Sequence, residues 1–253
     1  MTSDFDLTGE LALVTGSGSG IGLSIAHALS RAGARILLHG RDREKLEVAA
    51  GQFAPDRIAG CACFDIADET SVAKGFGELA DMGRMISILI NNAGSQLRQP
   101  LLDMDPADWR RIIDINLTGA FLVSRHVVPG MRQRGRGKIV NITSLAAEVA
   151  RPDVGPYTAA KGGLRMLTRT MAVEWAPFGI QANAIGPGHI VTEMTAATRA
   201  QPDFEAWARH RTPAGRWGEV QDLDGVAVFL ASRASDFVTG QTLYVDGGFL
   251  AAM

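Results

Sequence analysis

Short apolar runs alternate with longer amphipathic runs along the chain, and this alternation restricts the fold more than any other feature. The short runs have the length of strands, and most are apolar at nearly every position, as in MISILINNAG. Strands of this kind belong to parallel sheets that helices cover on both faces. The longer runs place apolar residues at helical intervals, as Ile21, Ile25 and Leu29 do. The pattern predicts an α/β fold with one doubly wound parallel sheet of about seven strands.

The chain is expected to form a single domain over residues 1–253, because it contains no linker, tandem repeat or low-complexity segment. Residues 106–133 are interpreted as one long helix or two abutting helices. An insert near residues 193–217 is expected to form the substrate loop, with a short helix around Phe204 to His210. Ligands of doubly wound sheets bind at the carboxyl ends of the strands, so the functional residues are expected there.

Composition and charge exclude several classes of protein. A net charge of −2 without basic runs gives no reason to expect nucleic acid or a membrane surface as a partner. There is no run of about 18 apolar residues, and the polar start is unlike a signal peptide. Cys61 and Cys63 are expected to be buried strand residues, since their spacing fits neither a metal site nor a disulfide framework. These features predict a cytoplasmic protein without a metal.

A glycine-rich segment, TGSGSGIG, follows the first expected strand and opens the first expected helix. Glycines in this context allow a sharp turn and let the backbone approach a pyrophosphate, which the free N–H groups of the helix N-terminus attract. The strand–turn–helix context makes this a Rossmann-type dinucleotide site rather than a flexible loop. The loop residues expected to bind the cofactor are Gly16, Ser17, Ser19, Gly20, Ile21 and Gly22.

Tyr157 and Lys161 lie four residues apart, which places them on one face of a helix. The pKa of a free tyrosine is about 10, too high for easy proton exchange at neutral pH. A nearby ammonium stabilises the phenolate, so Lys161 is expected to lower the pKa of Tyr157 and make it a general acid or base. Ser144 ends the fifth expected strand and could hydrogen-bond a substrate oxygen. An isolated pair at this spacing would be an ordinary helix surface.

The motifs together resemble the short-chain dehydrogenase/reductase family along the whole chain. The glycine spacing, NNAG at residues 91–94, the helical Asn116, the set Ser144, Tyr157 and Lys161, and the Pro187–Gly188 turn match it in order. The resemblance implies that Asn116, Ser144, Tyr157 and Lys161 are catalytic, with Asn116 holding a water near Lys161. It also implies a homotetramer. The further cofactor-binding residues that it implies, besides Tyr157 and Lys161, are Asp65, Ile66, Asn92, Ala93, Gly94, Pro187, Gly188, Ile190 and Thr192.

The segment after the second expected strand bears on the choice of nicotinamide cofactor. NAD-binding proteins usually carry an acidic residue there, but this chain has His39 and Gly40, followed by Arg41. A guanidinium can pair with a 2′-phosphate, so the segment favours NADP. NAD stays possible if Arg41 is a solvated loop residue and Asp42 turns toward the ribose.

Finer resemblance, in NNAGSQLRQP, LAAEVARPDVGPYTAAKGG and GHIVTEMT, is to gluconate 5-dehydrogenases, which interconvert gluconate and 5-ketogluconate. A sugar acid needs cations and hydrogen-bonding groups. Alternatives are a 3-oxoacyl-[acyl-carrier-protein] reductase, for which the basic residues 132–138 could bind the carrier, and a non-catalytic NADP-binding sensor. Five residues near the expected pocket are candidates for the substrate site, or else rim residues of surface loops: Gln96, Arg98, Glu148, Arg151 and His189.

Overall fold

The structure, a computed structural model, describes residues 4–81 and 85–252. Within these residues seven strands form one sheet in the order β3-β2-β1-β4-β5-β6-β7, and every neighbouring pair is parallel. The sheet confirms the predicted doubly wound α/β class. The strands are β1 Leu11–Val14, β2 Arg35–Gly40, β3 Ile58–Cys63, β4 Ile88–Asn91, β5 Gly137–Ile142, β6 Ile180–Pro187 and β7 Thr242–Val245.

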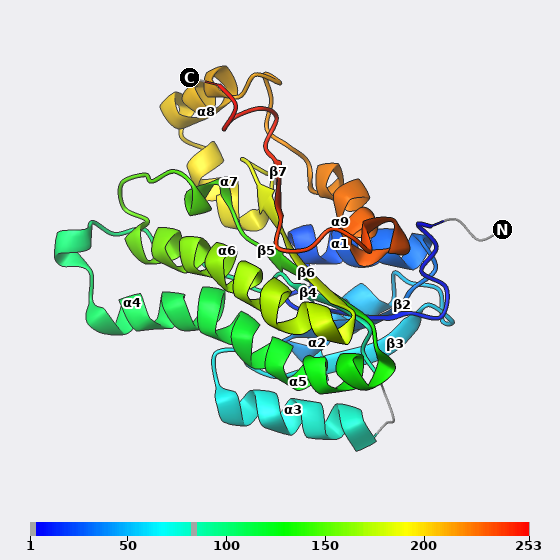
Figure 1. The fold of residues 1–253 in the computed structure, drawn as a ribbon. Helices are drawn as coiled ribbons and strands as arrows, with labels where there is room; N and C mark the ends of the chain where they lie inside the picture. Colours follow the sequence, from blue (N-terminus) through cyan, green and yellow to red (C-terminus); the bar gives the residue numbers. More distant parts are fainter. Residues whose placement is uncertain (1–3, 82–84, 253) are drawn as a thin grey trace.

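Helices cover both faces of this sheet (Figure 1). Among the described residues, α1 and α9 pack on each other and α2 lies beside β2 and β3, while α3, α5 and α6 cover the opposite face. The α-helices are α1 Gly20–Arg31, α2 Arg43–Ala50, α3 Glu69–Asp81, α4 Pro106–Ile113, α5 Gly119–Arg134, α6 Gly155–Trp175, α7 Glu193–Arg199, α8 Pro202–Arg211 and α9 Asp224–Ala231.

The core consists of two clusters, one on each face of the sheet, because successive strand residues point to opposite sides. Leu13 of β1 packs in the cluster beneath α3, α5 and α6, whereas its neighbour Val14 packs in the cluster beneath α1, α2 and α9. Both side chains are fully buried. Burial on both faces explains why these strands are apolar at consecutive positions.

The structure answers the question about residues 106–133. Helices α4 and α5 are joined by one π-helical turn, Asp114–Thr118, so the chain continues as helix throughout. π-Helical turns occur mostly as local bulges in α-helices, frequently at functional sites. This turn contains Asn116.

The helix predicted around Phe204 to His210 is present as α8, and the insert near residues 193–217 also contains α7, which starts at a capping box formed by Thr192 and Thr195. One local prediction was wrong. Cys61 and Cys63 are only partly buried, since they lie on β3 at the edge of the sheet. Over residues 4–81 and 85–252, no helix has the length and hydropathy needed to cross a membrane.

Candidate active site

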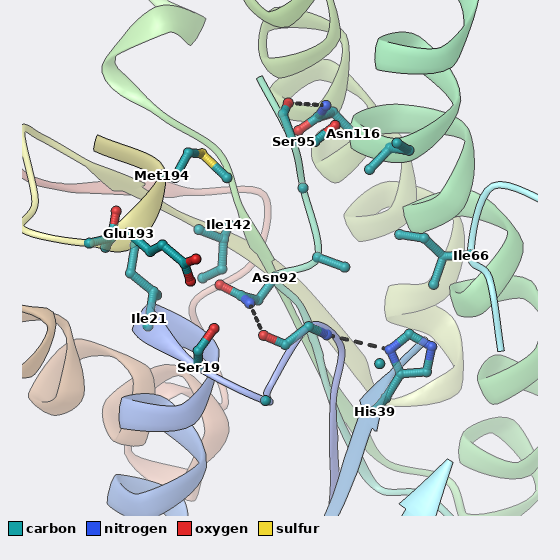
Figure 2. A pocket seen from close by; sticks show the side chains of 18 of the residues that line it. Ser19, Ile21, His39, Ile66, Asn92, Ser95, Asn116, Ile142, Glu193 and Met194 are labelled. Carbon is teal, nitrogen blue, oxygen red and sulfur yellow. Dashed lines mark hydrogen bonds between the residues drawn. The ribbon is translucent and has the colours of Figure 1, made fainter. Parts of the chain in front are cut away.

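A cavity of about 620 Å³ opens where β1, β2, β4, β5 and β6 end. This volume lies within the range of small-molecule and cofactor pockets. Figure 2 shows side chains from the glycine loop, the strand ends and the α7 segment around it. The cofactor-binding and catalytic candidates that line it are Gly16, Ser19, Gly20, Ile21, Arg41, Asp65, Ile66, Asn92, Ala93, Gly94, Asn116, Ser144, Tyr157, Lys161, Pro187, Gly188, Ile190 and Thr192.

The glycine loop has a backbone that other residues would not readily adopt. Gly16 has φ +63° and Gly20 has φ +58°, both in the left-handed region. A Cβ on Gly16 would lie 2.9 Å from Cα of Ala93, and a Cβ on Gly22 would lie 2.4 Å from the Gly16 carbonyl oxygen. The loop therefore packs directly on the end of β4 and turns into α1, leaving the N-terminus of that helix at the cavity. This arrangement fits a bound pyrophosphate.

Two predicted loop residues support the loop rather than line the cavity. Ser17 is fully buried, and it exchanges hydrogen bonds with the backbone of His39: the Ser17 N–H donates to the carbonyl, and Oγ accepts from the N–H. Gly22 packs under the Gly16 carbonyl. Both residues thus support the loop, and their contact with the cofactor stays a prediction.

The end of β2 supplies the cation predicted to select the cofactor. Arg41 lines the cavity with an exposed side chain, and its guanidinium lies 3.5 Å from the Asp65 carboxylate. Asp42 caps α2, because its carboxylate accepts from the Lys45 N–H at 3.0 Å. The alternative in which Asp42 turns to a ribose would break this cap, so the geometry favours a 2′-phosphate beside Arg41.

Ser144, Tyr157 and Lys161 line the cavity together. Lys161 is buried, and its ammonium donates a 2.8 Å hydrogen bond to the Ile142 carbonyl oxygen at the end of β5. The same ammonium lies 5.5 Å from the centre of the Tyr157 ring. Ser144 follows β5 and hydrogen-bonds to Tyr157. Helix α6 and the end of β5 thus place a hydroxyl, a phenol and an ammonium at one point of the cavity.

The expectation that the pKa of Tyr157 is lowered was wrong. Burial raises this pKa above its ordinary value of 10.0, against the opposing effects of the Ser144 hydrogen bond and the Arg151 charge. Burial also lowers the pKa of Lys161 to about 8, so the charged ammonium on which the expectation relied is itself disfavoured. Desolvation disfavours the charged form of both groups. Tyr157 is therefore a neutral phenol near pH 7, suited to donating a proton.

Asn116 lies in the π-helical turn with its side chain in the cavity lining (Figure 2). Its Nδ2 donates to the Ser95 and Ile112 carbonyl oxygens, at 2.8 Å and 2.9 Å. Its Oδ1 is buried and has no hydrogen-bond partner among the described residues. Gly94 leaves space beside this oxygen, because a Cβ there would lie 2.7 Å from Oδ1 and 3.7 Å from the Lys161 ammonium.

None of the five substrate candidates lines this cavity. Oε1 of Glu148 accepts from the Arg165 guanidinium and, at 2.6 Å, from the Tyr244 hydroxyl, so these two contacts orient the carboxylate. Arg98 is exposed and Gln96 is partly buried, and both follow the cavity residue Ser95 in the chain. The substrate roles of Glu148, Gln96 and Arg98 stay predictions.

Arg151 and His189 lie in an aromatic cluster at the base of α8. The Arg151 guanidinium lies 4.7 Å from the Phe204 ring centre. The His189 ring packs against four aromatic rings, and burial together with the Arg151 charge lowers its pKa to about 4. The rings around His189 are those of Phe204, Trp207, Trp217 and Phe249, at centre-to-centre distances of 5.6, 5.9, 5.3 and 5.2 Å. A neutral histidine in such surroundings anchors the insert, whereas Arg151 keeps its charge near Tyr157.

Some cavity residues were not among the sequence candidates. Lys45 and Glu193 come from α2 and α7, and their charged groups lie 3.8 Å apart. Lys45 follows Arg41 by four residues, and Glu193 directly follows the candidate Thr192, so these positions could have indicated both. The others that line the cavity are Gly18, His39, Gly40, Asp42, Leu46, Phe64, Ser95, Ile115, Ile142, Thr143, Met194 and Thr195.

Comparisons with known proteins agree with this geometry. A family model described as enoyl-(acyl carrier protein) reductase matches residues 16–250. The gluconate 5-dehydrogenase of Gluconobacter oxydans (strain 621H) is 47% identical over 251 residues, covering 98% of each chain. The 5-keto-D-gluconate 5-reductase of Escherichia coli (strain K12) is 41% identical over 254 residues, covering 100% of each. A crystal structure of a gluconate 5-dehydrogenase from Burkholderia cenocepacia J2315 in complex with NADP and tartrate superimposes with a TM-score of 0.95 at 46% identity, covering 99% of this chain and 98% of that one.

Proposed function

The chain belongs to the short-chain dehydrogenase/reductase family, and from that premise we propose that it transfers a hydride between NADP(H) and a sugar acid, interconverting D-gluconate and 5-keto-D-gluconate. The observation that carries the proposal is the convergence of Ser144, Tyr157 and Lys161 with the glycine loop in one cavity. The similarity to gluconate 5-dehydrogenases over 98% of the chain supports the substrate pair. The bound NADP in the Burkholderia enzyme supports the cofactor.

The residues present fit a dinucleotide. Gly16, Gly20 and the start of α1 would hold the pyrophosphate, and Arg41 would hold the 2′-phosphate. Pro187, Gly188 and Thr192 would lie along the nicotinamide at the other end of the cavity. The reduced nicotinamide, when bound there, supplies the hydride.

In the proposed mechanism the protein positions the carbonyl and supplies the proton. Ser144 would donate a hydrogen bond to the substrate oxygen and stabilise the negative charge that develops on it. Tyr157, neutral at pH 7, would donate its proton to the same oxygen. Lys161 would stabilise the phenolate that remains. Asn116 Oδ1 would accept a hydrogen bond from a water beside Lys161, and that water would restore the proton; the unpartnered oxygen and the space at Gly94 support this role.

The carrier-protein alternative has less support. The basic residues 132–138 belong to the end of α5 and the start of β5. They therefore lie at the amino-terminal end of β5, whereas Ser144 follows its carboxyl end. Three of the four cations in this segment are also engaged: Arg134 and Arg136 pair with Glu10, and Lys138 pairs with Asp236 at 2.8 Å. A free basic surface for an acidic carrier is therefore not expected beside the cavity.

Localisation and assembly are part of the proposal. We infer a cytoplasmic homotetramer, as the family resemblance implies. Exposed apolar side chains on α4, α5 and α6 support contacts between subunits, since a single chain leaves them in water. These side chains are Trp109, Phe121, Met166 and Val173. The mass in solution, measured by light scattering, tests the tetramer.

NADPH oxidation, followed by absorbance with NADH in parallel, tests the function. The substrates offered are 5-keto-D-gluconate and an acetoacetyl thioester. Turnover of the keto acid with a preference for NADPH is expected, and turnover of the thioester alone would move the protein to the fatty-acid reductases. Tyr157→Phe is expected to abolish turnover while NADPH still binds. A Tyr157→Phe protein with full activity would refute the mechanism, and binding of NADPH without turnover of any carbonyl would indicate a sensor.

A further inference from the structure

His39 is the penultimate residue of β2, a buried polar residue at the wall of the cavity with both ring nitrogens bonded. Its Nδ1 accepts a hydrogen bond from the Gly16 N–H at 3.4 Å. Its Nε2 lies 3.2 Å from the Phe64 carbonyl oxygen, to which it donates. The ring also packs against the Phe64 ring at 4.2 Å between centres. One side chain therefore connects the glycine loop to the end of β3.

Gly16 is held through both of its flanking peptide groups, and Figure 2 draws the two hydrogen bonds as dashed lines at His39 and Asn92. Its N–H donates to His39, and its carbonyl oxygen accepts from Asn92 Nδ2 at 3.1 Å. The backbone of His39 adds the two hydrogen bonds to Ser17 described above. Gly16 lies near the start of the turn between β1 and α1. The orientation of its peptide groups therefore sets the direction of the N–H groups that follow.

The hydrogen bond to Gly16 requires a neutral imidazole with its proton on Nε2. Protonation of Nδ1 would turn an acceptor into a donor that faces another N–H. Burial lowers the pKa of His39 to about 4, although the Phe64 carbonyl and the Asp65 carboxylate oppose this shift. The acceptor is therefore present throughout the neutral range.

We propose that His39 is a positioning residue for the dinucleotide: its Nδ1 fixes the Gly16 peptide, and thereby holds the glycine loop in the conformation that receives the adenosine half of the cofactor. This inference rests on the proposed NADP(H) site. The acidic residue that NAD-binding chains usually carry near the end of β2 reaches for a ribose. Here a side chain at the end of the same strand turns inward to the loop instead.

Two substitutions separate the two ring nitrogens. His39→Asn keeps an acceptor close to the Nδ1 position but cannot reach the Phe64 carbonyl. His39→Gln places its amide near the Nε2 position and leaves the Gly16 N–H without a partner. His27→Gln is the matched control, because His27 lies on α1, where it stacks on Phe53 at 4.1 Å and does not line the cavity.

The measurements are the Kd of NADPH by fluorescence, the Ki of adenosine 2′,5′-bisphosphate, kcat at saturating NADPH, and the unfolding temperature. In His39→Gln, Kd and Ki are expected to rise together by about tenfold, because binding would force the loop back into a conformation in which the buried Gly16 N–H has no acceptor. The value of kcat is expected to stay unchanged. In His39→Asn and His27→Gln, Kd and Ki are expected to stay within about twofold of the wild-type values.

Equal effects of His39→Asn and His39→Gln on Kd, or a loss of kcat without a change in Kd, would overturn the proposal. If His39→Gln does not fold, His39→Leu takes its place with the same expected result, since leucine also lacks the acceptor. Failure of the wild type to bind NADPH would instead refute the proposed function. A wild type that binds NADPH beside a His39→Gln protein that binds it equally well would refute only the role of His39.

Discussion

Glycine-to-alanine substitutions can separate the structural demand of the glycine loop from its demand as a binding site. Gly9, Gly16 and Gly20 all have positive φ, at +84°, +63° and +58°. Alanine in this conformation costs about 1–2 kcal/mol at each position. The surroundings differ: a Cβ meets nothing within 4 Å at Gly9 or Gly20, whereas at Gly16 it lies 2.9 Å from a backbone atom of Ala93. Only Gly16→Ala therefore adds an overpacking cost, about 1–3 kcal/mol.

These costs predict different losses of stability. For a domain of this size, 1 kcal/mol corresponds to about 2–4 °C in Tm. Gly9→Ala and Gly20→Ala are therefore expected to lower Tm by about 5 °C, and Gly16→Ala by about 10 °C. Differential scanning calorimetry at one pH and one protein concentration measures all three variants.

Cofactor binding is expected to follow a different order. Gly20 lines the cavity at the carboxyl ends of the strands, whereas Gly9 precedes the amino-terminal end of β1. A methyl group at Gly20 would occupy space that the proposed pyrophosphate needs, so Gly20→Ala is expected to raise the Kd of NADPH by about tenfold or more. Gly9→Ala, with the same backbone cost, is expected to leave Kd unchanged. A Gly20→Ala protein that binds NADPH as tightly as Gly9→Ala would show that the phosphates do not approach this backbone.

Three further predictions concern the ends of the cavity and its aromatic support. Arg41→Ala is expected to raise KM for NADPH by about tenfold and leave KM for NADH nearly unchanged; an unchanged ratio of the two would contradict the role of Arg41. Burial lowers the pKa of Lys161 to about 8 from 10.5, so the unfolded state binds more protons between these values and the burial penalty shrinks as pH rises. Urea titrations should therefore show Lys161→Met more stable than the wild type by a margin that is larger at pH 7 than at pH 10; a constant margin would contradict the shift. Trp217 is 6% exposed and Trp207 is 44% exposed. In the same titrations, Trp217→Ala is expected to lower the free energy of unfolding by about 3–5 kcal/mol, and Trp207→Ala by clearly less. Equal losses would refute the assignment of Trp217 as the anchor.

The sheet was predictable from the sequence because burial on both faces requires apolar residues at consecutive strand positions. In β4, every residue is buried, and the strand reads as one apolar run before Asn91. The glycine loop was predictable for a similar reason, since positive φ and close backbone packing favour glycine at Gly16.

Other features could not be predicted, because they depend on contacts between distant segments. The pKa of Tyr157 follows from its burial in the folded protein, whereas the spacing to Lys161 shows only that the two residues are near each other. The aromatic surroundings of His189 join residues from α8 and the C-terminal segment, about 15 to 60 positions away along the chain. The sequence placed Glu148 near the cavity, but its pairing with Arg165 and Tyr244 requires α6 and β7 to meet beside it.

The two ends of the cavity differ in how they are built, and this difference bears on substrate choice. At the cofactor end, residues such as Arg41 and Asn92 directly follow sheet strands, and hydrogen bonds among β1, β2 and β4 fix their positions. At the end where the substrate is proposed to bind, the candidates Arg98 and Arg151 lie on loops, and aromatic packing around His189 holds the insert. Loops tolerate sequence change better than strand ends do. Substrate specificity in this chain is therefore expected to depend on the segments around residues 95–104, 145–155 and 188–217, while the proton-donating set and the dinucleotide site stay the same.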